Sequence, residues 1–155
     1  MSIELQQHNE YKQIALHNYK QVGVKKEDLN VLPKGYKVLD IKNEANGFQA
    51  LVLQKGNDIV ICYRGTEGLN KKDLGNDLEM FRRMIPSQAR NALDLYDEYR
   101  RDYPNYNITV IGHSLGGSLA QIVGTLRDVT AVTFNAFGTR DILEKTFLFD
   151  CIPVK

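Results

Sequence analysis

Gly112, Ser114 and Gly116 form a Gly-x-Ser-x-Gly pattern in the second half of this 155-residue chain. In such a pattern the serine stands on a sharp turn between a strand and a helix, and the glycines remove side chains that would collide there. The serine hydroxyl projects from the end of the sheet, where it can attack a carbonyl carbon. We therefore predict that Ser114 is a catalytic nucleophile. The backbone N–H of Leu115, at the start of the helix, would donate to the oxyanion.

The segments on either side of Ser114 favour this interpretation. Residues 108–111 read Ile-Thr-Val-Ile, which is typical of a strand buried on both faces, and residues 115–126 carry apolar side chains at helical spacing. A strand before the serine and a helix after it are the context that the pattern requires. An alternative remains open at this stage, in which Ser114 only caps the helix.

The sheet that carries this turn is predicted to begin with antiparallel strands. Residues 36–41, 48–53 and 59–63 are rich in β-branched and aromatic residues. Asn46-Gly47 separates the first pair of segments, and Gly56-Asn57-Asp58 separates the second pair. Because these turn residues tolerate positive φ, we expect two successive hairpins.

The remaining elements are predicted to be helices and parallel strands. Residues 74–85 keep helical spacing, and a further helix is expected to begin at Pro86 and to end before Pro104. The strand at 108–111, the helix after it and a strand at 131–134 form a strand–helix–strand unit, which predicts parallel pairing.

The N-terminal segment, residues 1–22, is predicted to be an amphipathic helix. Its apolar stripe comprises Leu5, Tyr11, Ala15, Tyr19 and Val22, with His8 on the same stripe. The fold class is therefore α/β, with a mixed sheet that has helices on both faces. We expect one domain over residues 1–155, with the N-terminal helix preceding a core that spans residues 36–155.

Composition and charge exclude several classes of function. The chain has 20 Lys and Arg against 19 Asp and Glu, so it lacks the basic excess of a nucleic-acid-binding protein. It contains neither an apolar run of about 18–20 residues nor a signal peptide, so we expect no transmembrane segment and a cytoplasmic location. Export by a route without a signal peptide stays open. No spacing of metal ligands is present, and we expect no metal or organic cofactor.

Residues 112–120, Gly-His-Ser-Leu-Gly-Gly-Ser-Leu-Ala, resemble the nucleophile elbow of the class 3 lipases, a branch of the α/β-hydrolase superfamily. Arg64-Gly65-Thr66 resembles the Arg-Gly-Ser/Thr loop of that family, and this likeness implies that Thr66 is the second oxyanion donor. Residues 73–78 resemble the Asp-Trp-x-x-Asp segment of the family, with Leu74 in place of the aromatic residue, and residues 67–72 stand where these lipases carry a lid.

The resemblance continues to the C-terminus and implies a function. Residues 134–138 resemble the family's strand end after the elbow, and Asp150 begins an Asp-Cys-Ile-Pro segment that resembles the surroundings of the triad acid. The family implies a serine carboxylic-ester hydrolase, lipase-like or phospholipase-like, that acts on an ester or acyl-lipid substrate through an acyl-enzyme on Ser114. Read without the family, Asp150 is equally an ordinary strand-end carboxylate.

The histidine that would activate Ser114 is missing from its usual place. In this fold the triad follows the order Ser, Asp or Glu, His, yet the histidines of this chain are His8, His17 and His113, and none follows Ser114. The resemblance gives His113 a packing role. The fold is therefore expected to be incomplete at the C-terminus.

Three explanations of the missing histidine stay open. The chain could be the N-terminal part of a longer, truncated hydrolase. A second chain, or a second copy in a homo-oligomer, could complete the sheet and supply the histidine. The domain could also have lost catalysis and serve as a binding or assembly module, since an exposed edge strand is a template for pairing.

Overall fold

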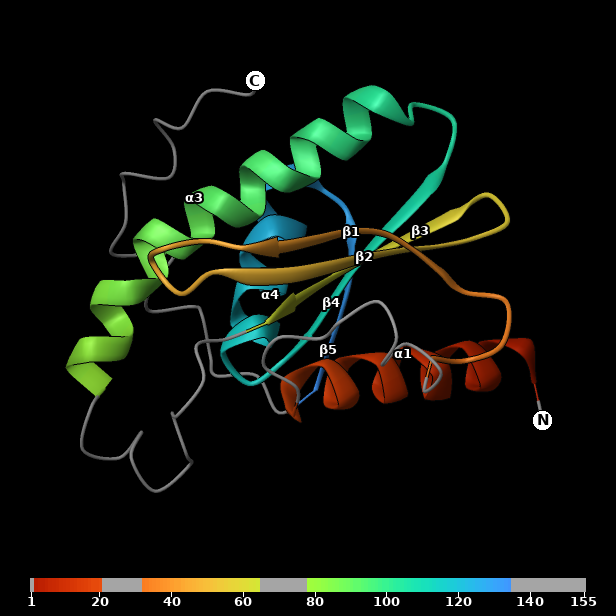
Figure 1. Ribbon diagram of the computed structural model, residues 1–155, viewed down its shortest axis with the longest axis horizontal. Coiled ribbons are helices and arrows are strands. Elements are labelled where there is room, and N and C mark those ends of the chain that lie inside the picture. Colours follow the sequence, from red (N-terminus) through yellow and green to blue (C-terminus); the bar gives the residue numbers. More distant parts are fainter. Residues whose placement is uncertain (1, 21–31, 65–77, 135–155) are drawn as a thin grey trace.

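The computed structural model describes residues 2–20, 32–64 and 78–134, and it describes side chains for residues 2–16, 32–64 and 83–134. Five strands form one sheet in the order β1-β2-β3-β4-β5. The strands are β1 (Lys37–Asn43), β2 (Gln49–Lys55), β3 (Asp58–Arg64), β4 (Asn107–His113) and β5 (Thr130–Phe134). The helices are α1 (Ile3–Lys20), α3 (Leu78–Asp102) and α4 (Leu115–Arg127). This arrangement confirms the predicted mixed α/β sheet (Figure 1).

The first three strands form the two predicted hairpins. β1 pairs antiparallel with β2, and β2 pairs antiparallel with β3. The turns contain Gly47 at φ 88° and Gly56 at φ 60°, which are conformations that favour glycine. A register shift between Val38 and Asp40 makes an irregularity in β1, the strand at one edge of the sheet.

The second half of the sheet is parallel, also as predicted. β4 inserts beside β3 with Tyr63 opposite Gly112, and β5 pairs with β4 with Phe134 opposite His113. Helix α3 connects β3 to β4, and helix α4 connects β4 to β5. The carboxyl ends of β3, β4 and β5 therefore lie along one edge of the sheet, which is where ligand sites form in sheets of this kind.

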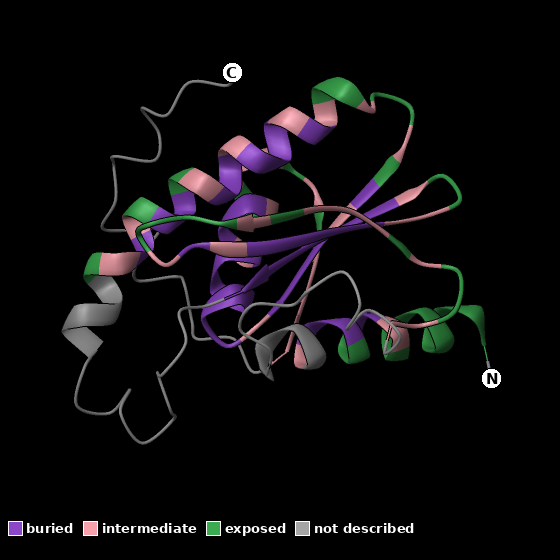
Figure 2. Cartoon of the chain, viewed as in Figure 1, coloured by how far each residue is buried: buried purple, intermediate pink, exposed green. Residues whose placement is uncertain are grey.

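Two hydrophobic clusters cover the two faces of the sheet. On one face the apolar sides of α3 and α4, including Leu93 and Leu119, pack with inward-facing side chains such as Ile61. On the other face Tyr11 and Ile14 of α1 pack against the strands. Figure 2 shows the buried strands between these layers, with the outer side of α1 exposed.

Within residues 2–16 the N-terminal helix is buried over a shorter length than predicted. The buried residues there are Tyr11, Ile14 and Ala15, whereas Leu5, predicted to be on this stripe, is 50% exposed and His8 is exposed as well. These three buried residues lie over β2, β3 and β4. Periodicity alone could not reveal where the sheet beneath the helix ends.

The predicted helix start at Pro86 is wrong. α3 is one helix from Leu78 to Asp102 with Pro86 inside it, and Figure 1 shows the helix changing direction near its N-terminal end. Proline removes one backbone hydrogen bond and commonly bends a helix. The helix continues because Ile85 and Ala89, on either side of the proline, are both fully buried in the same core.

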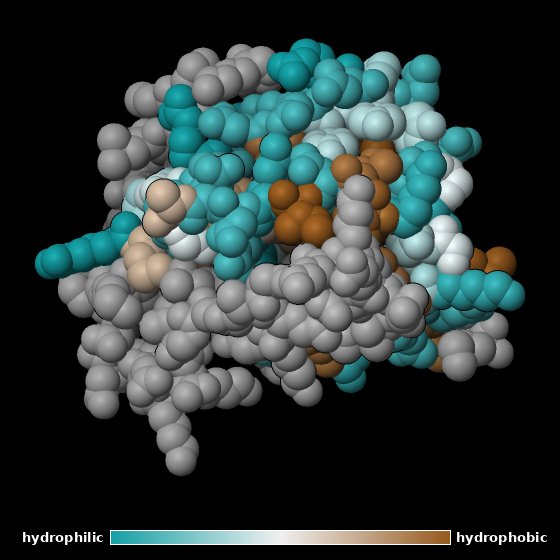
Figure 3. All heavy atoms as spheres, viewed as in Figure 1, coloured by the Kyte–Doolittle hydropathy of each residue, from teal (hydrophilic) through white to brown (hydrophobic). Residues whose placement is uncertain are grey.

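The described surface is mostly hydrophilic on the face shown in Figure 3. Large hydrophobic side chains that are exposed within the described ranges are those of Ile3, Leu5 and Ile41. Among the helices described here, none has the length and apolarity needed to cross a bilayer.

Candidate active site

Ser114 occupies the turn between the end of β4 and the start of α4, in a backbone conformation that disfavours side chains. Its φ is 56° and its ψ is −121°. These angles belong to the first central residue of a type II′ turn, a position that glycine dominates. A non-glycine residue held in such a region costs on the order of 1–3 kcal/mol, and strain of this kind gathers at functional sites.

The neighbouring backbone holds Ser114 in this conformation from both sides. The N–H of Ser114 donates to the carbonyl of Phe134 at the end of β5 (3.1 Å), and the carbonyl of Ser114 accepts from the N–H of Ser118 in α4 (3.1 Å). The Ser114 hydroxyl makes no capping hydrogen bond to α4, and the residue is 6% exposed. The capping interpretation of this serine therefore does not describe the structure.

The two glycines of the pattern allow three backbones to meet beneath Ser114. A Cβ atom on Gly112 would lie 2.2 Å from the carbonyl oxygen of Gly116, inside the first turn of α4. A Cβ atom on Gly116 would lie 2.0 Å from the carbonyl oxygen of Tyr63 in β3. A larger side chain at Gly116 would push the elbow, defined here as residues 112–118, away from β3, and one at Gly112 would push the first turn of α4 away from the end of β4.

The predicted oxyanion donor Leu115 is the first residue of α4. The first N–H groups of a helix have no intrahelical acceptor, and they lie at the positive end of the helix dipole. Because Tyr63 lies opposite Gly112, the end of β3 lies beside the elbow. Arg64, the last residue of β3, is 5% exposed.

Several residues singled out from the sequence lie outside the described residues. They are Thr66 and Asp150, the segment 67–72 at the position of a lid, and Asp73 and Asp77. The side chain of His17 also lies outside the described set. The roles assigned to these residues remain predictions.

The described histidines occupy different surroundings. His113 ends β4 directly before Ser114 and is half-buried. The exposed His8 of α1 packs its ring against Phe134, with ring centroids 5.2 Å apart and planes tilted by 60°. Phe134 is also the residue whose carbonyl accepts the N–H of Ser114. Helix α1 thus brings a histidine next to the residue that anchors the elbow.

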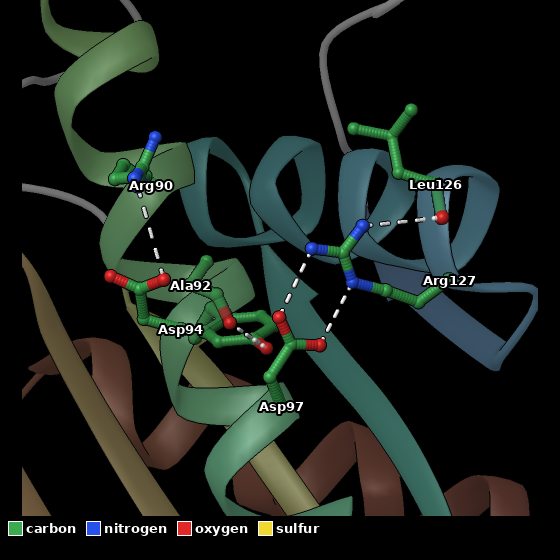
Figure 4. Close-up of polar contacts among 7 residues, drawn as sticks. Arg90, Ala92, Asp94, Asp97, Leu126 and Arg127 are labelled. Atoms are coloured by element: carbon green, nitrogen blue, oxygen red, sulfur yellow. Dashed lines mark hydrogen bonds and ion pairs between the residues drawn. The ribbon is translucent and has the colours of Figure 1, made fainter. Parts of the chain in front are cut away.

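An ion pair that sequence reasoning missed joins the two helices behind the sheet. Arg127, at the end of α4, donates from Nε to Asp97 Oδ1 (2.8 Å) and from Nη2 to Asp97 Oδ2 (3.0 Å) (Figure 4). The hydrogen bonds to Asp97 raise the pKa of Arg127. Asp97 is 6% exposed within the apolar face of α3. The sequence carries one signal of this ion pair, which is a carboxylate on a largely apolar helix face. A buried charge requires a partner.

No group of three or more His, Cys, Asp and Glu side chains in the described part of the chain is arranged to hold a metal ion. A groove of about 640 Å³ lies at the opposite end of the sheet, where β4 and β5 begin, and Tyr106, Asn107 and Thr130 are among the residues that line it. This groove includes no residue of the elbow.

Comparison with known proteins identifies the family. The family model described as a Tle-like phospholipase domain matches residues 6–146, which is most of the chain. The chain belongs to this phospholipase-like family. Fungal lipase structures share the fold of this chain. The resemblance stated from residues 112–120 and Arg64-Gly65-Thr66 is thereby confirmed at the level of the family.

The similar solved structures are fungal lipases. The triacylglyceride lipase of Rhizomucor miehei aligns with a TM-score of 0.64 and 16% identity, over 86% of this chain and 62% of that chain. A lipase from Rhizopus microsporus var. chinensis aligns with a TM-score of 0.56 and 15% identity, over 88% of this chain and 58% of that one. At these identities the likeness shows the fold alone.

A curated relative is the Pichia angusta protein named "Putative lipase ATG15", which is 35% identical over 77 residues. This match covers 50% of the present chain and 14% of the relative. The Penicillium rubens protein of the same name is 45% identical over 47 residues, which cover 30% of this chain and 7% of that protein. The chain thus spans a small part of its curated relatives and about 60% of the lipase structures.

Proposed function

We propose that the phospholipase-like domain hydrolyses carboxylic esters of acyl lipids through an acyl-enzyme on Ser114. The observation that carries the proposal is the strained Ser114, whose backbone is bound on both sides while its hydroxyl makes no cap hydrogen bond. Membership in the phospholipase-like family supports a lipid ester as the substrate class.

The proposed reaction has two steps. Ser114 Oγ attacks the ester carbonyl, its proton passes to a general base, and the leaving alcohol departs with that proton. The N–H of Leu115 and Thr66 stabilise the oxyanion during the attack. Water then attacks the acyl-enzyme, gives its proton to the base and releases the carboxylic acid, with Ser114 protonated again.

The general base that accepts the proton of Ser114 is not assigned to one histidine. Asp150 would orient a histidine, but residues 115–155 contain none. In this proposal the base is His8 or His17 of α1, a histidine from a continuation of this polypeptide, or a histidine from a second polypeptide. Catalysis by the isolated chain requires the first of these.

Labelling with a fluorophosphonate, followed by intact-mass measurement on the folded chain, tests the proposal. We expect one adduct on the wild type and none on Ser114→Ala. Ser87→Ala is the matched control, since Ser87 is an exposed serine of α3 whose label would report accessibility rather than activation. Vesicles of a phospholipid then test release of fatty acid by the same variants.

We propose as the alternative a catalytically inactive hydrolase domain that serves in binding or assembly. On this hypothesis the folded chain takes no label at Ser114. Addition of a candidate partner chain would restore labelling if that chain supplied the base. Failure of both measurements would remove ester hydrolysis from the functions of this polypeptide.

A further inference from the structure

Tyr63, at the end of β3, connects helix α3 to the elbow. Its hydroxyl donates to the backbone carbonyl of Ala92 in α3 at 2.8 Å, and the side chain is 1% exposed. Its own carbonyl oxygen is the atom that a Cβ on Gly116 would strike. One residue therefore touches α3 through its side chain and the elbow through its backbone.

Asp97 makes the corresponding connection from α3 to α4. Its carboxylate binds Arg127 through both oxygens, at the end of α4 that lies away from Ser114 (Figure 4). The other end of α4 is fixed by the backbone bonds of Ser114 and by the packing of Gly116. Because α4 is held at both ends, Asp97 sets the direction of the helix that begins at the elbow.

The two connections come from one short stretch of α3. Ala92 and Asp97 are about 7.5 Å apart along the helix axis, at 1.5 Å per residue. Burial, and after it the charge of Asp97, raise the pKa of Tyr63 well above its ordinary value, so its phenol remains a neutral donor. The contacts of Tyr63 and Asp97 thus involve one short stretch of α3.

We infer that α3 fixes the position of the elbow against the end of β3, and that Tyr63 and Asp97 are its two positioning residues. The inference rests on the proposed function, in which the Ser114 nucleophile and the Leu115 N–H donor both belong to the elbow. A nucleophile and an oxyanion donor act together only if their positions are held closely, since a displacement of about 1 Å can cost about a hundredfold in rate.

Two conservative variants and one matched control test the inference. Tyr63→Phe removes only the hydroxyl, and Asp97→Asn keeps the shape of the side chain while it removes the charge. Tyr99→Phe is the control, because the Tyr99 hydroxyl also joins α3 to the sheet, but at Asp40 of β1, far in the strand order from the elbow. Urea unfolding measures the stability lost by each variant.

The first readout is the rate of fluorophosphonate labelling, together with kcat and KM for a soluble ester. We expect Tyr63→Phe and Asp97→Asn each to lower kcat and the labelling rate by roughly tenfold, with little change in KM. This factor corresponds to a transition state that is less stable by about the free energy of one hydrogen bond. Tyr99→Phe is expected to lose stability without this change in kcat. Wild-type rates in Tyr63→Phe and Asp97→Asn, or an equal fall in Tyr99→Phe, would overturn the inference.

The second readout does not depend on catalysis. Amide hydrogen exchange, measured by NMR at Ser114 and Ser118, reports the two backbone bonds of the elbow. Exchange there should accelerate in Tyr63→Phe and Asp97→Asn, and it should be unchanged in Tyr99→Phe. If the wild type takes no label, the proposed function fails, and these exchange rates still decide whether α3 positions the elbow.

Discussion

Ser114 and Asp128 stand at opposite ends of helix α4, and within the described residues they are the non-glycine residues with positive φ. Their φ angles are nearly the same, at 56° and 52°, but their ψ angles are −121° and 49°. Asp128 is in the left-handed conformation that often ends helices and that Asp tolerates. Ser114 is in a region that is normally left to glycine.

The surroundings of the two residues explain how each conformation is maintained. Asp128 is exposed, and the nearby N–H of Val129 donates to Gly124 within the same helix end. Ser114 is buried, and its conformation depends on the carbonyl of Phe134 in β5 and on the close packing of Gly116 against Tyr63 in β3. A helix stop is thus a local structure, whereas the elbow exists only in the assembled sheet.

The largest expected effect concerns the packing that supports the elbow. Gly116→Ala should destabilise the domain by about 3 kcal/mol, because its Cβ meets backbone atoms that cannot turn aside. Alanine's better helix propensity, worth about 1 kcal/mol, offsets only part of this loss. Urea unfolding followed by circular dichroism measures the difference.

Gly56→Ala is the control for this substitution. Gly56, unlike Gly116, has positive φ (60°), and an added Cβ there meets no atom within 4 Å. Gly56→Ala should lower the free energy of unfolding by about 1–2 kcal/mol, because of the backbone conformation alone. A Gly116→Ala variant as stable as Gly56→Ala would show that the close approach to β3 does not constrain the elbow.

The next effect concerns strain at Ser114. Ser114→Gly and Ser114→Ala both remove the hydroxyl, but only glycine adopts the angles of this position freely. We expect the glycine variant to be more stable by about 1–2 kcal/mol, despite the greater flexibility of glycine in the unfolded chain. Thermal unfolding of the two variants makes the comparison, and an alanine variant of equal or greater stability would mean that the conformation stores no strain.

The smallest effect is expected at the other end of α4. Asp128→Gly should exceed Asp128→Ala in stability by about 1 kcal/mol, the ordinary benefit of glycine in a left-handed helix end. The same thermal measurement applies. If the stability difference between the glycine and alanine variants were larger at Asp128 than at Ser114, the distinction between the two sites would be reversed.

The sequence predicted the parts of the molecule that local patterns determine. Asn46-Gly47 and the glycine at 56 specified the hairpins, and the Gly-x-Ser-x-Gly pattern specified a strand, a turn and a helix around Ser114. These signals are short, and each acts through the φ preference of one or two residues. The resemblance to lipases added the family.

Interactions between distant segments leave no local pattern in the sequence. Pro86 reads as a helix start, and only the buried core around Ile85 and Ala89 shows why the helix continues through it. Asp97 and Arg127 are 30 positions apart in the sequence. The helical spacing around Asp97 could indicate that its carboxylate is buried, but it could not indicate which residue binds it. The roles of Thr66 and Asp150 stay predictions.

The parallel pairing of β3 with β4 also has a consequence for the order of folding. Asp58 and Asn107, which pair at the start of these strands, are 49 positions apart, whereas the hairpins close over a few residues. Local hairpins form in about 1–10 μs, and contacts across long loops form later because closing the loop costs entropy. The angles of Ser114 require both β3 and β5, so its hydroxyl is set in place only late in folding. A nascent or partly unfolded chain would therefore hold an unstrained serine, and the elbow would form only with the finished sheet.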